Sequence, residues 1–188
     1  MKKVWILLTL LFCTKAFGQD NCLLEAEKII NSIRSFQADF IEENYQKGTK
    51  TEGKIFLKKP GLMRLDYLKP EKMSLYLKDK IITHYNYELE EVSYLQDQEA
   101  SFLAKDKINF LEDFDESFCK EEGNKIRFVV KKKDWLVEVL LLGAQLEGFT
   151  TFSENIPLSQ VIFTRQETNL KLKNDIFTFK DKKFFNHE

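Results

Sequence analysis

The alternation of apolar and polar positions along the chain predicts one helix followed by many short strands. From Asp20 to about Ser35, apolar side chains recur at steps of three and four residues, which is the spacing of an amphipathic helix. After Phe36 the spacing changes to two, and each alternating run is short. Turn signals such as Lys59-Pro60-Gly61 and Lys69-Pro70 separate these runs, so we expect consecutive strands joined by close turns.

Residues 101–114 interrupt this alternation, because their apolar side chains lie among Lys and Asp without a period of two. We expect one or two short helices there. Strands that follow one another without crossover helices pair antiparallel, and a single sheet of this size tends to curl. The sequence therefore predicts an α+β, mainly β protein in which helices cover the concave face of a curved sheet. The expected strands are 36–41, 53–57, 62–65, 73–77, 81–85, 92–95, 126–130, 135–142, 147–152, 158–164 and 177–179.

The first residues have the pattern of a cleavable secretory signal. Lys2 and Lys3 precede an apolar run at residues 4–13, which is too short to span a bilayer because a span needs about 20 residues. Ala16 and Gly18 supply the small side chains of a cleavage site. We expect residues 1–18 to be a signal peptide and residues 19–188 to form one domain; the alternative is an uncleaved N-terminal anchor.

The residues before the cysteines argue against a lipid anchor. A lipidated cysteine follows a small residue, whereas Cys13 follows Phe12 and Cys22 follows Asn21. We therefore expect the processed chain to diffuse freely in the periplasm. Cys22 and Cys119 would remain after cleavage, and in an oxidising compartment they could form one disulfide or stay as two separate thiols.

Charge and residue inventory exclude several classes of function. Removing the three lysines of the signal leaves 26 basic against 30 acidic residues, so a basic surface for nucleic acid is not expected. The two histidines, His84 and His187, have no neighbour at metal-ligand spacing, and no glycine-rich phosphate loop or nucleophile motif is present. We expect no metal, no cofactor and no catalytic site.

Aromatic residues are abundant in the remaining chain, which keeps fifteen Phe, six Tyr and one Trp after residue 18. Most of them are expected to serve as ordinary core. As a set, on a curled sheet closed by short helices, they would line an apolar cavity. Such a cavity suits an acyl chain, whose burial contributes about 0.8 kcal/mol per methylene.

An ordered series of short motifs resembles a known family. The chain carries Phe36-Gln37-Ala38-Asp39-Phe40, the run from Gly53 to Tyr67, then Tyr85-Asn86, Glu90-Glu91-Val92 and Phe177-Thr178-Phe179. In this order they resemble the LolA family of outer-membrane lipoprotein carriers, over nearly all of the chain after the signal. No single motif is specific; the order and the signal together carry the resemblance.

The resemblance implies a curved, incomplete antiparallel barrel with a helical lid over an apolar cavity. It implies a monomeric, non-enzymatic periplasmic chaperone that takes acylated lipoproteins from an inner-membrane ABC transporter complex. The chaperone shields the acyl chains and delivers them to an outer-membrane receptor. The side chains expected to line the cavity are Phe36, Phe40, Ile55, Leu57, Leu65, Leu75, Phe102, Leu103 and Phe110.

The resemblance also implies roles for residues near the first Lys-Pro turn. Lys59 stands where family members commonly have an Arg that bonds to the lid, and Arg64 is the alternative residue for that contact. Lys lacks the planar fork of Arg, so its contact with the lid should be weaker. Met63 matches a position where some members present an exposed Phe to the transporter. The alternative for both positions is a hairpin turn followed by an ordinary core methionine.

Three other functions share parts of this pattern. An anchored receptor of the LolB type has the same architecture, but it would need a lipidation site. A periplasmic lipid-binding sensor of the same fold would usually carry a further domain. An enzyme is disfavoured by the absent catalytic inventory.

Overall fold

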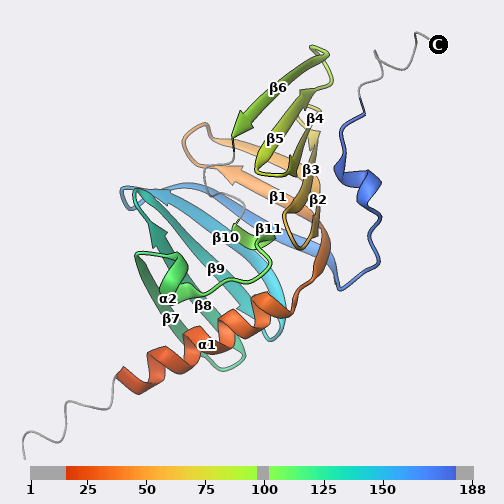
Figure 1. Cartoon of the computed structure of the whole chain (residues 1–188). Helices are drawn as coiled ribbons and strands as arrows, with labels where there is room; N and C mark the ends of the chain where they lie inside the picture. Colours follow the sequence, from red (N-terminus) through yellow and green to blue (C-terminus); the bar gives the residue numbers. More distant parts are fainter. Residues whose placement is uncertain (1–15, 97–101, 181–188) are drawn as a thin grey trace, which may run out of the picture.

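The computed structural model describes residues 16–96 and 102–180. One long helix precedes a single sheet of eleven antiparallel strands, and short helices follow the sixth and the last strand (Figure 1). The first half contains α1 (Ala16–Ser32), β1 (Ser35–Asn44), β2 (Thr49–Lys58), β3 (Leu62–Lys69), β4 (Met73–Lys78), β5 (Ile81–Asn86) and β6 (Glu91–Gln96). The second half contains η1 (Phe102–Ala104), α2 (Phe110–Asp113), β7 (Glu116–Glu122), β8 (Lys125–Lys132), β9 (Trp135–Leu142), β10 (Gln145–Ser153), β11 (Ile156–Thr168) and η2 (Asn174–Phe177).

The sheet is curved and does not close into a barrel. Its strand order is β6-β5-β4-β3-β2-β1-β11-β10-β9-β8-β7, so the two halves of the chain meet where β1 pairs with β11. This leaves β6 and β7 as the two edges. The predicted fold class is confirmed: a mainly β protein with a curved, unclosed antiparallel sheet, one N-terminal helix and short helices.

Helix α1 lies across the concave face of the β7–β9 half of the sheet (Figure 1). Its buried stripe has the predicted spacing and consists of Cys22, Leu23, Ala26 and Ile30, with Ile33 just beyond the helix. The helix already includes Ala16, the first described residue, so it extends beyond the expected start at Asp20 and contains the predicted cleavage site after Gly18. Residues 1–15 lie outside the described residues, and the signal peptide stays a prediction. No helix in residues 16–96 and 102–180 is long and apolar enough to cross a membrane.

The core lies between α1, the short helices and the inner face of the sheet. Alternate residues of the strands point inward, and the largest fully buried side chains include Phe36, Phe110, Phe128 and Leu141. Phe110 of α2 packs on Phe128 of β8 with ring centroids 4.7 Å apart, which joins the short helices to the sheet. The predicted short helices at 101–114 are present as η1 and α2.

Two elements differ from the expected pattern. The polar run at 116–122 forms β7, which the sequence did not predict; it pairs on one side only, and its inward Cys119 packs against α1. The expected strand at 177–179 is wrong. Phe177 ends the short helix η2, which contacts β3 and β4, and its side chain is buried at 1% exposure. The other expected strands lie within observed ones.

Candidate functional site

The predicted cavity residues converge beneath the C-terminal end of α1, where they are packed almost shut. The remaining space is about 10 Å³, which is at the lower limit for one water molecule. Of the residues predicted to line a cavity, Phe36, Ile55, Leu57 and Leu103 surround this space. The remaining lining side chains are Ile30, Ile33, Lys59, Leu146 and Phe163.

A second, open cavity of about 550 Å³ lies beside this packed interior. Its apolar wall includes Leu77 of β4, Phe102 of η1, Phe114 and Trp135 of β9. Phe102 and Trp135 meet edge to face with centroids 5.6 Å apart, so the wall is held by aromatic packing. The remaining lining residues are Pro60, Gly61, Lys80, Gln96, Ala104, Lys105, Asp106, Asp113 and Lys132. The cavity is therefore apolar within and bordered by charged side chains.

The other predicted cavity residues lie further away. Phe40, Leu65 and Leu75 are on the same face of the sheet, along β1, β3 and β4, but none is among the described side chains that line either space. Phe40 is buried against the ring of Tyr67, and Leu75 is only half-buried. Phe110 belongs to the cover and not to the sheet.

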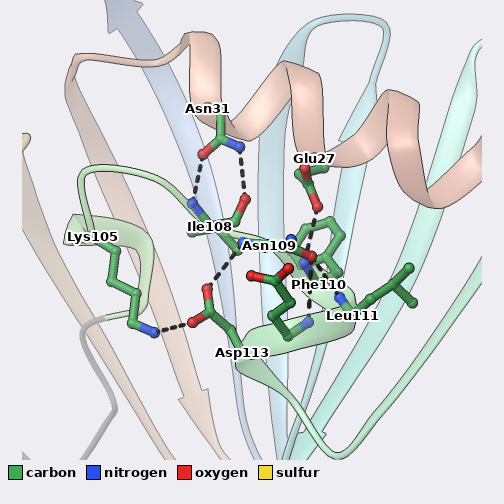
Figure 2. A network of polar contacts seen from close by, with 9 residues as sticks. Glu27, Asn31, Lys105, Ile108, Asn109, Phe110, Leu111 and Asp113 are labelled. Carbon is green, nitrogen blue, oxygen red and sulfur yellow. Dashed lines mark hydrogen bonds and ion pairs between the residues drawn. The ribbon is translucent and has the colours of Figure 1, made fainter.

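We call residues 102–114, which contain η1 and α2, the lid segment. Figure 2 shows how polar side chains of α1 hold it. The Asn31 side chain donates to the Ile108 carbonyl at 2.8 Å and accepts from the Ile108 amide at 2.9 Å. The Glu27 carboxylate accepts from the amide of Phe110 at 2.9 Å. We call these three bonds the latch, because they join the two parts of the cover over the interior.

The lid segment is also ordered from within (Figure 2). Asn109 is the N-cap of α2 and accepts from the amides of Leu111 and Glu112. The Asp113 carboxylate accepts from the amide of Asn109 and pairs with Lys105 at 2.8 Å. Burial opposes ionisation of Asp113, but these hydrogen bonds prevail and its pKa lies below the ordinary value.

The turn between β2 and β3 contacts both parts of the cover. The amide of Gly61 donates to the Ala104 carbonyl at 2.7 Å, and the amide of Lys59 donates to the Arg34 carbonyl at 2.9 Å. Arg34 in turn donates to the backbone carbonyl and carboxylate of Asp106. The hydrogen bond and charge of Arg34 hold the pKa of Asp106 below its usual range. The turn, α1 and the lid segment thus form one connected set.

Lys59 is buried, with 6% of its surface exposed, and its Nζ donates to the Ile30 carbonyl at 2.8 Å. Ile30 lies in the last turn of α1, where carbonyl groups lack helical partners and favour a cation. Burial, followed by the positive charge of Arg34, lowers the pKa of Lys59 from 10.5 to about 8, while Asp106 opposes this shift. The structure therefore places Lys59 against α1; whether it controls the lid stays a prediction.

Arg64 lies away from the lid, which corrects the expectation of a lid contact. It is on the opposite face of β3, where Nε bonds Asp66 at 2.9 Å and Nη1 donates to the carbonyl of Ile176. Its guanidinium also stacks over the rings of Phe56 and Tyr76. Arg64 thus anchors the C-terminal segment to the outside of the sheet.

Met63 is half-buried on the inner face of β3 and packs against the core. It lies between Leu57 of β2 and Leu77 of β4 in the sheet register, and Leu77 lines the open cavity. This position suits a core methionine and also lies close to the cavity wall. A docking role for Met63 stays a prediction.

Cys22 of α1 and Cys119 of β7 are joined by a disulfide, with their Cα atoms 5.7 Å apart. The sequence left this bond open as one of two alternatives. Together with the Lys59–Ile30 hydrogen bond, it attaches α1 at Cys22, in the first half of the helix, and at Ile30, in its last turn. The lid segment, by contrast, is joined to α1 by hydrogen bonds and apolar packing, without a covalent bond.

Sequence reasoning missed the latch residues Glu27 and Asn31. Asn109 with Glu112 three residues later is an N-cap signature that marks the start of α2, and it could have been recognised. Nothing local distinguishes Asn31 from an ordinary solvent-facing side chain of an amphipathic helix. Its partner lies 77 positions along the chain, so only the folded structure reveals the pair. No metal-ligand cluster occurs among the residues that the structure describes.

The sequence of residues 31–180 matches the family of the outer membrane lipoprotein carrier protein LolA. The chain belongs to the LolA family. This confirms the resemblance of the ordered motifs, and it accounts for a lidded apolar interior on an unclosed sheet. The LolA family is a non-enzymatic carrier family.

Relatives of this LolA-family chain share its length or its fold. An uncharacterized protein of Rickettsia prowazekii (strain Madrid E) is 24% identical over 203 residues, covering 98% of this chain and 91% of that protein. The crystal structure of an uncharacterized conserved protein from Thermus thermophilus has a TM-score of 0.59 at 14% identity, covering 87% of this chain and 94% of that one. The complex structure of Pseudomonas aeruginosa MucA/MucB matches with a TM-score of 0.51 at 15% identity, covering 85% of this chain and 61% of that one. These two structures show likeness of fold alone.

Proposed function

We propose that this protein is a periplasmic chaperone that binds the acyl chains of lipoproteins released from the inner membrane and carries them to an outer-membrane receptor. The observation that carries the proposal is an apolar interior closed by a cover whose two parts are joined by a few hydrogen bonds and apolar packing, without a covalent bond between them. An apolar site with few polar groups suits an acyl chain, because acyl burial depends on area rather than on directional contacts.

In this proposal the structure corresponds to a closed conformation of the carrier, because the interior beneath α1 is packed almost shut. Admitting an acyl chain requires the latch to break, and each hydrogen bond contributes about 0.5–1.5 kcal/mol net. Each methylene transferred from water contributes about 0.8 kcal/mol in the opposite direction. Burial of a handful of methylenes therefore offsets the loss of the latch, and the further methylenes of a long acyl chain offset the exposure of buried lid side chains such as Ile108 and Phe110. The cargo itself would open the lid.

The open cavity would serve as the entrance. It borders the lid segment, the β2–β3 turn and the aromatic wall at Trp135, so a chain entering there lies beside the packed interior. Movement of the lid segment would join the two spaces, since Leu103 lines the interior while Phe102 and Ala104 line the open cavity. We propose that cargo arrives from an inner-membrane ABC-type releasing complex, with Met63 near the docking surface.

A fluorescent apolar probe tests the proposal. We expect the probe to bind with enhanced emission and to be displaced by a triacylated cysteine peptide, but not by the same peptide without acyl chains. Leu103→Glu, which places a charge in the interior, should abolish probe binding, and Leu111→Glu on the exposed side of α2 is the matched control. Failure of the acylated peptide to displace the probe would contradict an acyl-carrier role.

A further inference from the structure

The two edges of the sheet are protected very differently. Strand β7 is joined to α1 by the disulfide, contacts α2 and carries charged side chains at Glu116, Lys120, Glu121 and Glu122. Strand β6 pairs with β5 in an unbroken register and ends the strand order. In the described part of the chain, no other element pairs with its outer side (Figure 1).

Beyond Glu91 at its start, strand β6 lacks the features that usually prevent an edge from pairing. Proteins protect edges with charges, proline or bulges. The run from Val92 to Gln96 contains no charge and no proline, and its pairing with β5 shows no bulge. Tyr94 is 69% and Leu95 57% exposed. A strand edge presents alternating N–H and C=O groups, so its natural partner is an extended peptide.

An apolar row connects this edge to the open cavity. Leu77 of β4 lines the cavity. In the sheet register Leu77 lies beside Ile82 of β5, and Ile82 lies beside Leu95 of β6. These three side chains share the inner face of the sheet. Gln96, the last residue of β6, also lines the cavity. A polypeptide whose acyl chains occupied the cavity would leave it directly beside β6.

We propose that β6 binds the peptide segment that follows the acylated cysteine of a cargo lipoprotein, by adding it to the sheet as a further strand. This inference rests on the proposed carrier function and names the part of the cargo that the protein recognises beyond its acyl chains. Backbone pairing is independent of side-chain sequence, so one edge serves cargoes with different sequences. The apolar row guides the acylated end, and the edge holds the chain that follows.

Two triacylated cysteine peptides of different length test this inference. One carries about two further residues and the other about ten, enough to cover a strand the length of β6. Both should displace the apolar probe, and the longer one should bind about tenfold more tightly. Hydrogen exchange at the amides of residues 91–96 should slow with the longer peptide alone. Equal affinities and unchanged exchange at β6 would overturn the inference and leave the acyl-carrier role intact. Displacement by neither peptide would overturn both.

Matched variants separate backbone pairing from other contacts. Successive residues of an edge strand point their amides alternately toward the sheet and toward the open side. Ser93→Pro and Tyr94→Pro each remove one backbone amide, and only one of these amides points to the open side of the edge. The variant that loses the open-side amide should melt near the temperature of the parent protein, and it should bind the longer peptide no more tightly than the shorter one. If both variants melt well below the parent temperature, two versions of the longer peptide are used instead, N-methylated at odd or at even residues. One version should bind no more tightly than the shorter peptide, and the other should keep the tighter binding.

A second copy of this chain is the rival occupant of the edge. Analytical ultracentrifugation of the unliganded protein at rising concentration shows whether two copies associate. We expect a monomer whose β6 amides exchange at a rate independent of concentration. A dimer that protects residues 91–96, and that the longer acylated peptide does not dissociate, would overturn the inference.

Discussion

Lys59 is a buried cation whose position follows from a short turn and the end of a helix. Its Nζ reaches the carbonyl of Ile30 after the β2 strand ends, and its own amide bonds Arg34. A lysine makes this contact with a single point charge, without the two parallel bonds that a guanidinium could form. The charged amine of Lys59 is therefore still destabilised by its burial, and this burial is the main cause of its lowered pKa.

The lowered pKa of Lys59 predicts a rise in stability on the alkaline side. Below about pH 8 the amine is charged in both the folded and the unfolded protein. Between about pH 8 and 10 the folded protein has released this proton while the unfolded chain, with a pKa of 10.5, retains it. The unfolded state then binds more protons, so this group makes the free energy of unfolding increase with pH.

Urea unfolding at pH 7, 8, 9 and 10 measures this effect. The raised pKa values of Tyr67 and Tyr76 act with the opposite sign, but only near and above pH 10. Lys59→Met should remove the rise, while Lys58→Met, which changes a lysine bonded to the Leu172 carbonyl, should preserve it. A slope that persists in Lys59→Met would assign it to another group.

Asn31 should stabilise the closed lid more than its partly exposed position suggests. Asn31→Ala leaves the amide and carbonyl of Ile108, a buried residue, without their partner, so we expect a loss of about 1–3 kcal/mol in unfolding free energy. Amides at 108–110 should exchange faster, and the apolar probe should bind faster. Ser32→Ala is the control, because Ser32 bonds the Ile29 carbonyl within the same helix. Equal effects of the two variants would argue against a latch.

At the scale of elements, the helix and the lid segment are attached differently. Helix α1 is bound covalently to β7 and by Lys59 to the β2–β3 turn. The lid segment has no covalent attachment: it is held by the latch, by Arg34, by the Gly61–Ala104 backbone bond and by apolar packing such as that of Phe110 on Phe128. Hydrogen bonds exchange with water at small net cost, whereas the disulfide does not. The segment is therefore the element expected to move when cargo enters.

Removing the disulfide should destabilise the protein and loosen α1. The bond closes a loop with a sequence separation of 97, for which constraint of the unfolded chain corresponds to about 2–5 kcal/mol. The Cys22→Ser, Cys119→Ser double variant should lose this amount in urea unfolding, and the amides of residues 22–30 should exchange faster. Mass spectrometry after alkylation, with and without reductant, provides the check. If the alkylated protein has the same mass with and without reductant, Cys22 and Cys119 are free thiols.

At the scale of the whole molecule, the unclosed sheet allows a carrier to exchange its cargo. A closed barrel would have no edge, whereas here the region between β6 and β7 contains the lid segment and the open cavity. Curvature places apolar side chains of both halves around one interior. Helix α1 contacts mainly β7 and β8, and its C-terminal end also covers Phe36 of β1 and Ile55 and Leu57 of β2. Strands β3 and β4 present half-buried residues such as Leu65 and Leu75.

Depletion of the protein should strand lipoproteins at the inner membrane. In the proposed function this protein carries lipoproteins between the two membranes, so we expect newly made lipoproteins to fractionate with the inner membrane after depletion. Restoring the full-length chain should reverse this, and a chain expressed without residues 1–18 should not. N-terminal sequencing of the exported protein would locate the cleavage site. Normal lipoprotein distribution after depletion would exclude the carrier role.

Periodicity was sufficient for most of the fold. The apolar stripe of α1 and the alternation in strands such as 53–57 and 135–142 depend on local spacing, which a linear sequence displays directly. The ordered motifs also sufficed for the family. Local spacing failed for 116–122, whose strand forms because β8 and α1 are beside it. It also failed for 177–179, where Phe177 is buried at the end of η2, a short helix that contacts β3 and β4.

The site depended on contacts between distant segments. The sequence determined which residue types are available: apolar side chains for an interior, a lysine before Pro60 and two cysteines able to pair. Only the tertiary structure decided that Arg64 faces away, that Asn31 meets Ile108 and that the interior is packed shut beneath α1. Side-chain spacing repeats every few residues and is visible locally, whereas hydrogen bonds across 77 positions exist only once the sheet has curved and brought the segments together.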